Sequence, residues 1–399
     1  MTVRILAIDT LAQAEKAILS IGAEPSAVQF MAPKAVSRVI KLQRVRPPAA
    51  NIIKQEMLSF GGEAATAYGA INNSVESTDL LIFGTLKQIN LLVEKLKLHQ
   101  FGLPQLAAEI KTSLENYEAK PRAMRFRSQN FDFGQRTYLM GILNVTPDSF
   151  SDGGQYLTAD QAVAQAKQLV ADGADIIDVG GESTRPGAAE VSVDEEKRRV
   201  LPVIERLARE TDTIISIDST KAEVVAAALA AGASMVNDIS GFRADPRLVK
   251  IVAEAGCPIC LMHRRGTPKE MQINPVYHDL MNEIIEYLSE GLEIAKKSGI
   301  LPEQIIVDPG IGFGKSLEHN LEIMKRLKEL KVLGCPVLVG TSRKSFIGKV
   351  LDLPVDDRSE GTAATVALAI AGGADFIRVH DIKAMARVAR MTDTILRRS

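Results

Sequence analysis

Residues 138–154, YLMGILNVTPDSFSDGG, set out the pattern that decides the fold. An apolar run ends at a polar residue, Asn144, and a loop of small, turn-prone residues follows it. Comparable runs recur up to the C-terminus, and most precede a loop and a segment of helical periodicity. The other runs are DIIDVG (175–180), TIISID (213–218), SMVNDI (234–239), PICLMH (258–263), QIIVDP (304–309), PVLVGT (336–341) and DFIRVH (375–380). Strands that alternate with helices in this way are predicted to pair in parallel.

Polar residues near the ends of these runs indicate how the sheet is arranged. They are Asn144, Asp178, Asp218, Asn237, His263, Asp308 and His380. In a closed barrel the C-terminal strand ends share one face, which favours a barrel over the alternative of an open doubly wound sheet with two insertions. The interval also has the length of about 250 residues that such a barrel needs. Residues 137–399 are therefore predicted to form an eight-stranded parallel (β/α)8 barrel, the TIM-barrel architecture.

The first part of the chain does not follow this pattern. VRILAID (3–9) and DLLIFGT (79–85) are predicted strands, and three segments near them have helical periodicity. Residues 1–117 are thus predicted to form a smaller α/β or α+β domain, whose role the sequence does not reveal. Residues 118–136 lack clear periodicity and carry several Lys and Arg residues. They are predicted to be a linker, with contact to a phosphate or a partner as the alternative.

Composition bounds the class of protein. The chain has 399 residues, and its 48 Lys and Arg nearly cancel its 49 Asp and Glu. A net charge of -1 argues against a broad surface for nucleic acid or anionic membrane. Three cysteines are too few for a disulfide-stapled secreted protein, and no apolar run is long enough to span a membrane. Since the N-terminus lacks the layout of a signal peptide, we expect a cytoplasmic protein.

Three strand ends carry hydrogen-bond acceptors in apolar surroundings. Asp218, Asn237 and Asp308 each end an apolar run. A carboxylate in such a place is costly to desolvate without partners, and tying down a loop is the alternative role for each. Together, two carboxylates and an amide match a ligand edge rich in N–H donors, such as an aminopyrimidinone ring.

Basic residues follow the last two predicted strands. Lys344 lies in the sequence TSRK (341–344), and Arg378 and His380 lie in RVH (378–380). The loops after strands 7 and 8 are where barrels often bind phosphate, and a solvated basic loop is the alternative. The loops 144–154 and 180–187 are rich in Gly and polar residues, and they are predicted to lie on the same rim, with plain turns as the alternative.

Two patterns look like known motifs but do not fit them. GIGFGKS (310–316) ends in Gly-Lys-Ser, but a phosphate-binding loop would need glycine where Pro309 stands. Cys257 and Cys260 have the spacing of a redox or zinc pair, but there is no second pair, so core packing is favoured.

Taken together, the motifs closely resemble those of the dihydropteroate synthase family of pterin-binding enzymes. GILNVTPDSFSDGG, DVGGESTRPGA, SIDST, VNDISG, LMH, VDPGIGFGK, GTSRKSF and RVHD occur in order from about Leu139 to the end of the chain. The resemblance implies a (β/α)8 barrel that joins 6-hydroxymethyl-7,8-dihydropterin diphosphate to 4-aminobenzoate. The products would be 7,8-dihydropteroate and diphosphate, in folate biosynthesis, and sulfonamides would compete with 4-aminobenzoate.

The resemblance also implies roles for individual residues. Asp218, Asn237 and Asp308 would bind the donor edge of the pterin. Lys344, Arg378 and His380 would form the catalytic group: Lys344 would reach the acceptor side of the pterin, Arg378 would stack on the ring, and Arg378 and His380 would help Arg185 to hold the diphosphate. Asn144 would bind Mg²⁺ with diphosphate oxygens. The residues expected to shape the aminobenzoate pocket are Phe150, Thr184 and Pro186.

Other properties of the family set further expectations. Its members are commonly homodimers that act on small molecules, without nucleic acid or membrane. This chain departs from the family in the long segment before the barrel and in the adjacent Arg264 and Arg265. The alternatives are a methyltetrahydrofolate:corrinoid methyltransferase, which is not expected to need the SRK, RVHD and STRPG motifs together, and a non-catalytic pterin-binding protein.

Overall fold

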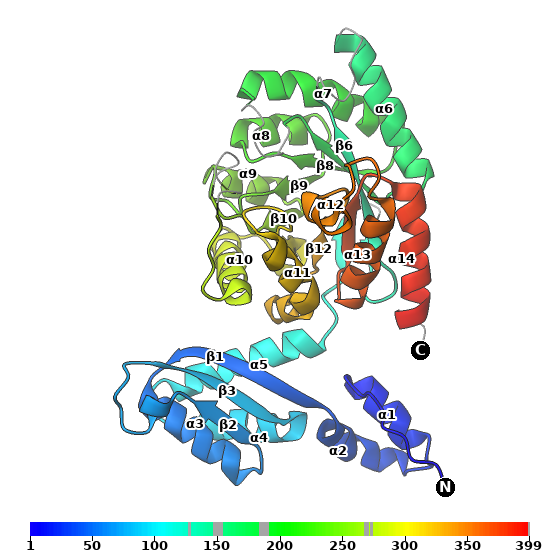
Figure 1. Ribbon diagram of the computed structural model, residues 1–399. Helices are drawn as coiled ribbons and strands as arrows, with labels where there is room; N and C mark the ends of the chain where they lie inside the picture. The colour runs from blue at the N-terminus through cyan, green and yellow to red at the C-terminus, as the bar shows by residue number, and fades with distance from the viewer. Residues whose placement is uncertain (127–128, 147–154, 183–190, 267–270, 272–273, 398–399) are drawn as a thin grey trace. The chain divides into compact units, whose positions relative to one another are not determined.

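The computed structural model describes residues 1–126, 129–146, 155–182, 191–266, 271 and 274–397. The chain divides into two compact units, Met1–Glu118 and Ala119–Ser399 (Figure 1). Each unit has its own apolar core, as expected of a domain. Among the described residues, no helix combines the length and the apolar character that crossing a membrane requires.

Unit 1 is an α+β domain built on a small antiparallel sheet. Its strands lie in the order β1 (Ser37–Val45), β3 (Thr78–Thr85), β2 (Glu63–Thr66). Buried side chains of the sheet, such as Leu80 and Ile82, belong to one core together with side chains of the helices. The α-helices are α1 (Leu11–Leu19), α2 (Pro25–Ala35), α3 (Pro47–Ser59), α4 (Leu86–Leu96) and α5 (Leu103–Glu118). A single 3-10 turn, η1 (Tyr68–Ala70), lies between β2 and β3.

The predicted strand at residues 3–9 is wrong. These residues are irregular, and Val3 and Ile5 are 87% and 98% exposed. The chain becomes regular at Thr10, whose hydroxyl accepts from Gln13 N–H in the capping box that begins α1. An apolar run forms a strand only where it finds a neighbour to pair with, and β1 and β2 flank β3 in this sheet.

Unit 2 contains the predicted barrel. Its parallel strands lie in the order β11-β10-β9-β8-β7-β6-β13-β12. A parallel bridge between Val307 and Val337 closes the ring, and Val307 N–H donates to the Pro336 carbonyl at 2.9 Å. The fold prediction for the barrel is therefore confirmed. The strands are β6 (Tyr138–Asn144), β7 (Ile176–Gly180), β8 (Ile214–Asp218), β9 (Met235–Asp238), β10 (Ile259–Met262), β11 (Ile305–Asp308), β12 (Leu338–Val339) and β13 (Phe376–Val379).

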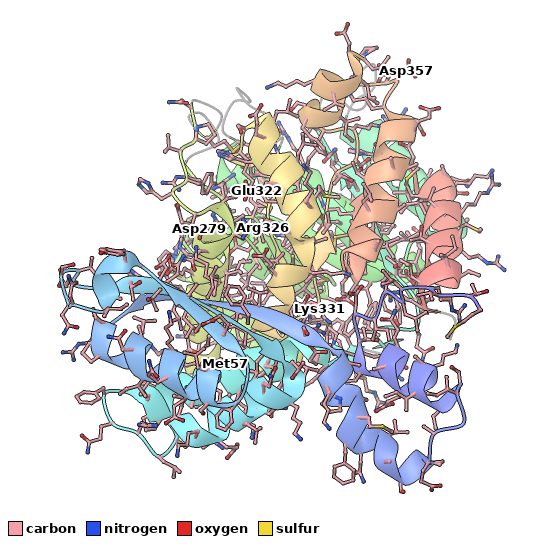
Figure 2. The ribbon with its side chains drawn as sticks, turned by 60° about the horizontal axis from the view of Figure 1, so that its bottom comes forward. Met57, Asp279, Glu322, Arg326, Lys331 and Asp357 are labelled. Carbon is pink, nitrogen blue, oxygen red and sulfur yellow. The ribbon has the colours of Figure 1, made fainter. Side chains whose placement is uncertain are left out.

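Helices surround the barrel and bury the outer faces of its strands (Figure 1). Their exposed faces carry ion pairs, as on the helix Leu317–Arg326, where Arg326 binds Glu322 at 2.6 Å (Figure 2). The α-helices are α6 (Gln155–Ala171), α7 (Val193–Glu210), α8 (Ala222–Ala230), α9 (Leu248–Ala255), α10 (Leu280–Lys297), α11 (Leu317–Arg326), α12 (Ser345–Leu351), α13 (Ser359–Ala371) and α14 (Ile382–Arg397). In the described part of this unit, the 3-10 segments η3 (Pro302–Gln304) and η4 (Leu327–Leu333) lie before β11 and after α11.

Residues 118–136 were predicted to be a linker, but all of them after Glu118 belong to the compact unit that contains the barrel. It contains a short hairpin, β4 (Met124–Phe126) and β5 (Gln129–Phe131). Phe131 and Phe133 are almost fully buried in a cluster with Tyr138 and Phe376, whose rings lie 4.7 to 5.9 Å apart. Tyr138 and Phe376 belong to the amino-terminal ends of their strands, so the hairpin closes that end of the barrel. Apolar residues spaced among basic ones hid this contact in the sequence.

Candidate active site

The barrel interior changes from apolar to polar along the strands. Near the amino-terminal end the inward side chains form an apolar layer that includes Met140, Ile176, Ile214, Met235, Cys260, Ile306, Leu338 and Phe376. Because side chains alternate across a strand, the residues two positions later also point inward. This second layer includes Asp178, Ser216, Asn237, Asp308 and Arg378. The carboxyl-terminal end of the barrel is therefore lined with polar groups above an apolar floor.

Arg378 belongs to a hydrogen-bond network that joins four strands. Its Nε and Nη2 donate to Asp178 Oδ2 and Asp218 Oδ2, each at 2.6 Å. Asn237 Nδ2 also donates to Asp178 Oδ2, at 2.9 Å. These side chains come from β13, β7, β8 and β9, which lie near one another around the ring. The edge of the guanidinium group is thus fixed by two carboxylates, which determines the direction in which its flat face points.

The Asp218 carboxyl is held in a setting that disfavours its charge. Burial raises its pKa to about 7, although the Arg378 guanidinium acts in the opposite direction. A group that titrates near neutral pH at the mouth of a barrel is typical of a functional site. The sequence places Asp178 near a strand end but does not mark it as a site residue, because nothing in the sequence pairs it with Arg378, 200 positions away.

Asp308 and Lys344 form the opposite side of the site. Asp308 is 6% exposed, and its Oδ1 accepts from Gly310 N–H at 2.6 Å. Burial raises the pKa of Asp308, against the attraction of Lys344. Burial also lowers the pKa of Lys344 to about 8, against the attraction of Asp308 and Asp218. Lys344 Nζ donates to the Ile311 carbonyl and lies 4.8 Å from the centre of the Phe313 ring.

Lys315, the lysine of the Gly-Lys-Ser pattern, is buried beside this pair. Its Nζ lies 2.8 Å from His263 Nδ1 and 3.0 Å from the Phe313 carbonyl. Burial lowers the pKa of His263 to about 2, which keeps this ring neutral. Burial also places the pKa of Lys315 well below its ordinary value. The sequence does not reveal this pair, because Lys315 and His263 are 52 positions apart in the chain.

His380 and the loop after β12 are tied together. Ser342 Oγ lies 2.9 Å from His380 Nδ1, and His380 N–H donates to the same hydroxyl at 3.2 Å. Next to it, Arg343 forms two hydrogen bonds with the Asp381 carboxylate, at 2.7 and 3.1 Å. These contacts fix the loop from which Lys344 reaches the site.

Asn144 lies beside Asp218 at the end of β6. A Cβ atom built on Gly180 would lie 3.8 Å from both Asn144 Oδ1 and Asp218 Oδ2, so the two oxygens face the same small space. Glycine at position 180 keeps that space open between neighbouring strands. Asn144 therefore joins the rim on the side of Asp218.

The structure brings the described candidate residues to one end of the barrel. They are Asn144, Asp218, Asn237, Asp308, Lys344, Arg378 and His380. Phe150, Thr184, Arg185 and Pro186 lie outside the described residues. Cys257 and Cys260 are buried free thiols whose pKa values are raised by burial, as suits core residues. The site thus offers buried acceptors and two cations to a flat, polar ligand.

Comparisons with known proteins agree on one family. Residues 140–380 match the family model described as "Pterin binding enzyme". A dihydropteroate synthase of Synechocystis is 54% identical over 268 residues, which cover 67% of this chain and 93% of that protein. The solved structure of the Yersinia pestis dihydropteroate synthase with a sulfonamide drug is 43% identical, with a TM-score of 0.65, and covers 69% of this chain and 99% of that one.

One relative also covers unit 1. A probable bifunctional folylpolyglutamate synthase/dihydropteroate synthase of Halobacterium salinarum is 43% identical over 390 residues. The match spans 97% of this chain and 47% of that protein. Unit 1 therefore has a counterpart in a curated relative, which the sequence alone had not revealed.

Proposed function

The chain belongs to the dihydropteroate synthase family of pterin-binding enzymes, and on that premise we propose which residues bind each part of the substrates. The chain is a transferase that joins 6-hydroxymethyl-7,8-dihydropterin diphosphate to 4-aminobenzoate, giving 7,8-dihydropteroate and diphosphate. One observation supports the roles proposed for individual residues. Hydrogen-bond acceptors and a cation from five strands lie together near the carboxyl-terminal end of one barrel.

Asp218, Asn237 and Asp308 are proposed to bind the donor edge of the pterin. Carboxylates accept hydrogen bonds only, and burial makes each unmatched acceptor costly, which favours a ring with several N–H donors. Asp178 Oδ1 supports this role, since it is buried and has no hydrogen-bond partner among the described residues. Hydrogen bonds from the ring would offset the burial that raises the pKa of Asp218 and Asp308.

Lys344 and Arg378 are proposed to hold the ring from its other sides. The Arg378 guanidinium has its edge bound to Asp178 and Asp218, so its face is the surface that can stack on a flat heterocycle. Lys344 is a point charge that can donate to a ring oxygen or nitrogen on the acceptor side. Its position beside Phe313 supports a mixed polar and apolar pocket.

The diphosphate is proposed to bind at the rim, between Asn144, Arg185, Arg378 and His380. Mg²⁺ prefers oxygen ligands and usually takes only one or two from the protein, with phosphate oxygens and water completing the shell. Asn144 Oδ1 fits that chemistry, since it is an amide oxygen at the rim, 3.8 Å from the position of a Cβ atom built on Gly180. When bound, Mg²⁺ would neutralise charge on the diphosphate.

In the proposed reaction the C–O bond to diphosphate breaks and a C–N bond to the arylamine forms. The electron-rich dihydropterin can stabilise the methylene cation left by diphosphate, so departure precedes attack and the amine then loses a proton to water. His380 and Arg378 stabilise the departing charge, because fixed donors act strongly in a buried site. No protein nucleophile is required. Holding both substrates in attack geometry supplies up to about 7 to 11 kcal/mol.

The aminobenzoate subsite is assigned to Phe150, Thr184 and Pro186. The sulfonamide drug in the solved Yersinia pestis relative supports a pocket for an aminobenzoate-like ring in this family. The comparisons favour this function over a corrinoid methyltransferase or a non-catalytic protein, since curated relatives that are 50 to 54% identical are dihydropteroate synthases.

We further propose a cytoplasmic homodimer. Free, buried cysteines support a reducing compartment. Exposed apolar residues on α13 and α14, among them Leu368 at 60% and Ile395 at 66% exposure, support a second copy as partner.

The decisive experiment is incubation of the purified chain with pterin diphosphate, 4-aminobenzoate and Mg²⁺. Dihydropteroate that forms only when both organic substrates are present, in step with diphosphate release, is the expected result. Diphosphate release without dihydropteroate would mean hydrolysis and contradict the assignment. Omitting Mg²⁺ while adding a chelator tests the metal, and unchanged turnover would remove it from the proposal.

A further inference from the structure

Lys344 lies at a sharp bend of the backbone between β12 and α12. Arg343, just before it, has a φ of 57°, in the left-handed region that residues other than glycine rarely adopt. Lys344 is extended, with a φ of -67° and a ψ of 154°, and α12 begins at the next residue. The direction in which the Lys344 side chain leaves the backbone therefore depends on how this bend is held.

Arg358, the N-cap residue of α13, holds the bend through backbone carbonyls. Its Nη1 donates to the carbonyls of Arg343 and Lys344, at 3.0 and 3.4 Å. On its other side, Nε and Nη2 donate to the Leu353 carbonyl, at 3.1 and 3.0 Å. Helix α12 lies between these carbonyls, so one guanidinium group joins the residues that precede the helix to a residue that follows it.

The middle of α12 leaves room for this guanidinium group. A Cβ atom built on Gly348 would lie 2.2 Å from Arg358 Nη2 and 2.4 Å from its Cζ, so a larger residue would displace the group. Helix α13 also holds the bend at a second point, because Arg343 N–H donates to Thr362 Oγ1 at 3.2 Å. The bend before Lys344 is thus fixed by hydrogen bonds from α13.

The other end of the Lys344 side chain fits closely into the site. Its Nζ donates to the Ile311 carbonyl and lies 4.8 Å from the centre of the Phe313 ring. A Cβ atom built on Gly312 would lie 3.0 Å from Lys344 Cδ, so the chain after β11 packs tightly against the lysine stem. A small movement of the Lys344 backbone would therefore withdraw the ammonium group from these contacts.

We propose that Arg358 is a positioning residue that fixes the backbone at Lys344 and thereby directs its ammonium group toward the pterin. The inference rests on the proposed function, which assigns Lys344 to the acceptor side of the ring. Arg358 does not need to touch a substrate, because it acts through the carbonyls that it binds. Without those hydrogen bonds the left-handed conformation at Arg343 loses support, and the bend should relax.

Two variants disrupt the same contacts in different ways. Arg358→Met removes the guanidinium group. Gly348→Ala keeps it but places a methyl group against Nη2, and alanine also favours the helical conformation of α12. Arg358→Lys is the conservative variant. Arg397→Met is the matched control, because Arg397 also donates to a backbone carbonyl, that of Ala374 at 3.1 Å, but before β13 at the amino-terminal end of the barrel.

The first readout is the pH at which Lys344 loses its proton. Burial lowers the pKa of Lys344 to about 8, while Asp308 and Asp218 act in the opposite direction and Arg378 lowers it further. Acetylation of the full chain with acetic anhydride over a range of pH, with mass spectrometry of the peptide that contains Lys344, measures this midpoint without any substrate. The midpoint should rise by about one pH unit or more in both test variants, because burial is the largest effect and a lysine released toward water regains its ordinary pKa.

The second readout is the Kd for pterin diphosphate, measured by isothermal titration calorimetry. It should rise about tenfold or more in Arg358→Met and in Gly348→Ala, because a small misplacement of a binding group weakens the contact that it makes. Arg358→Lys should recover part of the loss, since it restores a donor with one nitrogen in place of three. Gly348→Ala should add little in the Arg358→Met background, because the group that it displaces is no longer there. Arg397→Met should change neither readout.

A purely structural role predicts easier unfolding with wild-type values of both readouts in the folded variants. An unchanged acetylation midpoint or an unchanged Kd in the folded test variants would overturn the proposal, and so would equal shifts in Arg397→Met. Should Arg358→Met not fold, Gly348→Ala gives the same two readouts. If the wild-type chain does not bind pterin diphosphate, the proposed function fails, while the acetylation midpoint still decides whether Arg358 positions Lys344.

Discussion

Burial acts on the acids and the bases of the site in opposite directions. It raises the pKa of Asp218 and Asp308 and lowers the pKa of Lys315 and Lys344. Each residue is thereby moved toward its neutral form, and the ion pairs and hydrogen bonds between them partly reverse the effect. Single substitutions in this set should consequently change both ligand affinity and the pH at which the enzyme works.

Replacing Asp308 by alanine should abolish tight binding of the pterin diphosphate. The change removes a buried acceptor and leaves Lys344 without the nearby carboxylate, which should cost about 3 kcal/mol or about 100-fold in Kd. Isothermal titration calorimetry measures the loss. Asp357→Ala, which removes an exposed carboxylate between α12 and α13 (Figure 2), should bind as the wild type does. Near-normal affinity in Asp308→Ala would remove this residue from the pterin site.

Deprotonation of Lys344 should cause the fall of kcat/KM at alkaline pH. Its pKa of about 8 means that the ammonium group loses its proton, and with it the charge, as the pH rises through 8. If the charged form binds the pterin, kcat/KM for pterin diphosphate should fall above that pH. Lys344→Arg should move the fall to higher pH, because a guanidinium stays protonated. A fall at the same pH in both proteins would assign it to another group.

At the scale of elements, the sequence predicted the barrel strands well, whereas of the two strands predicted in unit 1 the one at 79–85 is observed as β3 and the one at 3–9 is not observed. Strands buried on both faces form apolar runs whose ends are marked by polar residues, so β6 was predicted with its bounds as observed. The exposed run at residues 3–9 has the same composition but no neighbour to pair with. Likewise, the β4–β5 hairpin packs through Phe131 and Phe133, which the sequence separates by polar residues.

The candidate site was predictable in part, because polar residues at the ends of apolar strands can be recognised in the sequence. Asp218, Asn237 and Asp308 stand at strand ends, where barrel geometry brings them together. Asp178 and Lys315 were missed because their partners, Arg378 and His263, are distant in sequence, and pairing between strands far apart is decided by the closed ring. The roles assigned to Phe150 and to residues 184–186 stay predictions.

The hairpin at the amino-terminal end of the barrel should matter for stability and leave the chemistry alone. Phe133 is 1% exposed among Tyr138 and Phe376. Phe133→Ala should lower the free energy of unfolding by about 3 to 5 kcal/mol, as for other buried aromatic residues. Denaturant unfolding of the full chain measures this, with the exposed Phe30→Ala as control. A large change in KM at full folding would show that this end of the barrel influences the site.

At the scale of the whole molecule, the two units should be separable. Unit 2 begins at Ala119 and has its own core, so residues 119–399 should fold and keep kcat/KM within about threefold of the full chain. A version that starts at residue 130 lacks β4 and should be less stable. Circular dichroism and the turnover assay compare the three proteins. Loss of turnover in a folded 119–399 protein would give unit 1 a part in catalysis.

The raised pKa of Asp218 also links pterin binding to the release of a proton into the buffer. A pterin that donates hydrogen bonds to Asp218 favours the carboxylate, which lowers its pKa from about 7 and expels a proton at pH 6 to 7. Calorimetric heats of pterin binding should therefore vary with the ionisation enthalpy of the buffer, and Asp218→Asn should remove most of that variation. Heats that are identical in phosphate and in Tris would contradict this linkage. Pterin binding by this enzyme therefore releases a proton. The apparent affinity for the pterin should rise as the pH increases from 6 to 7.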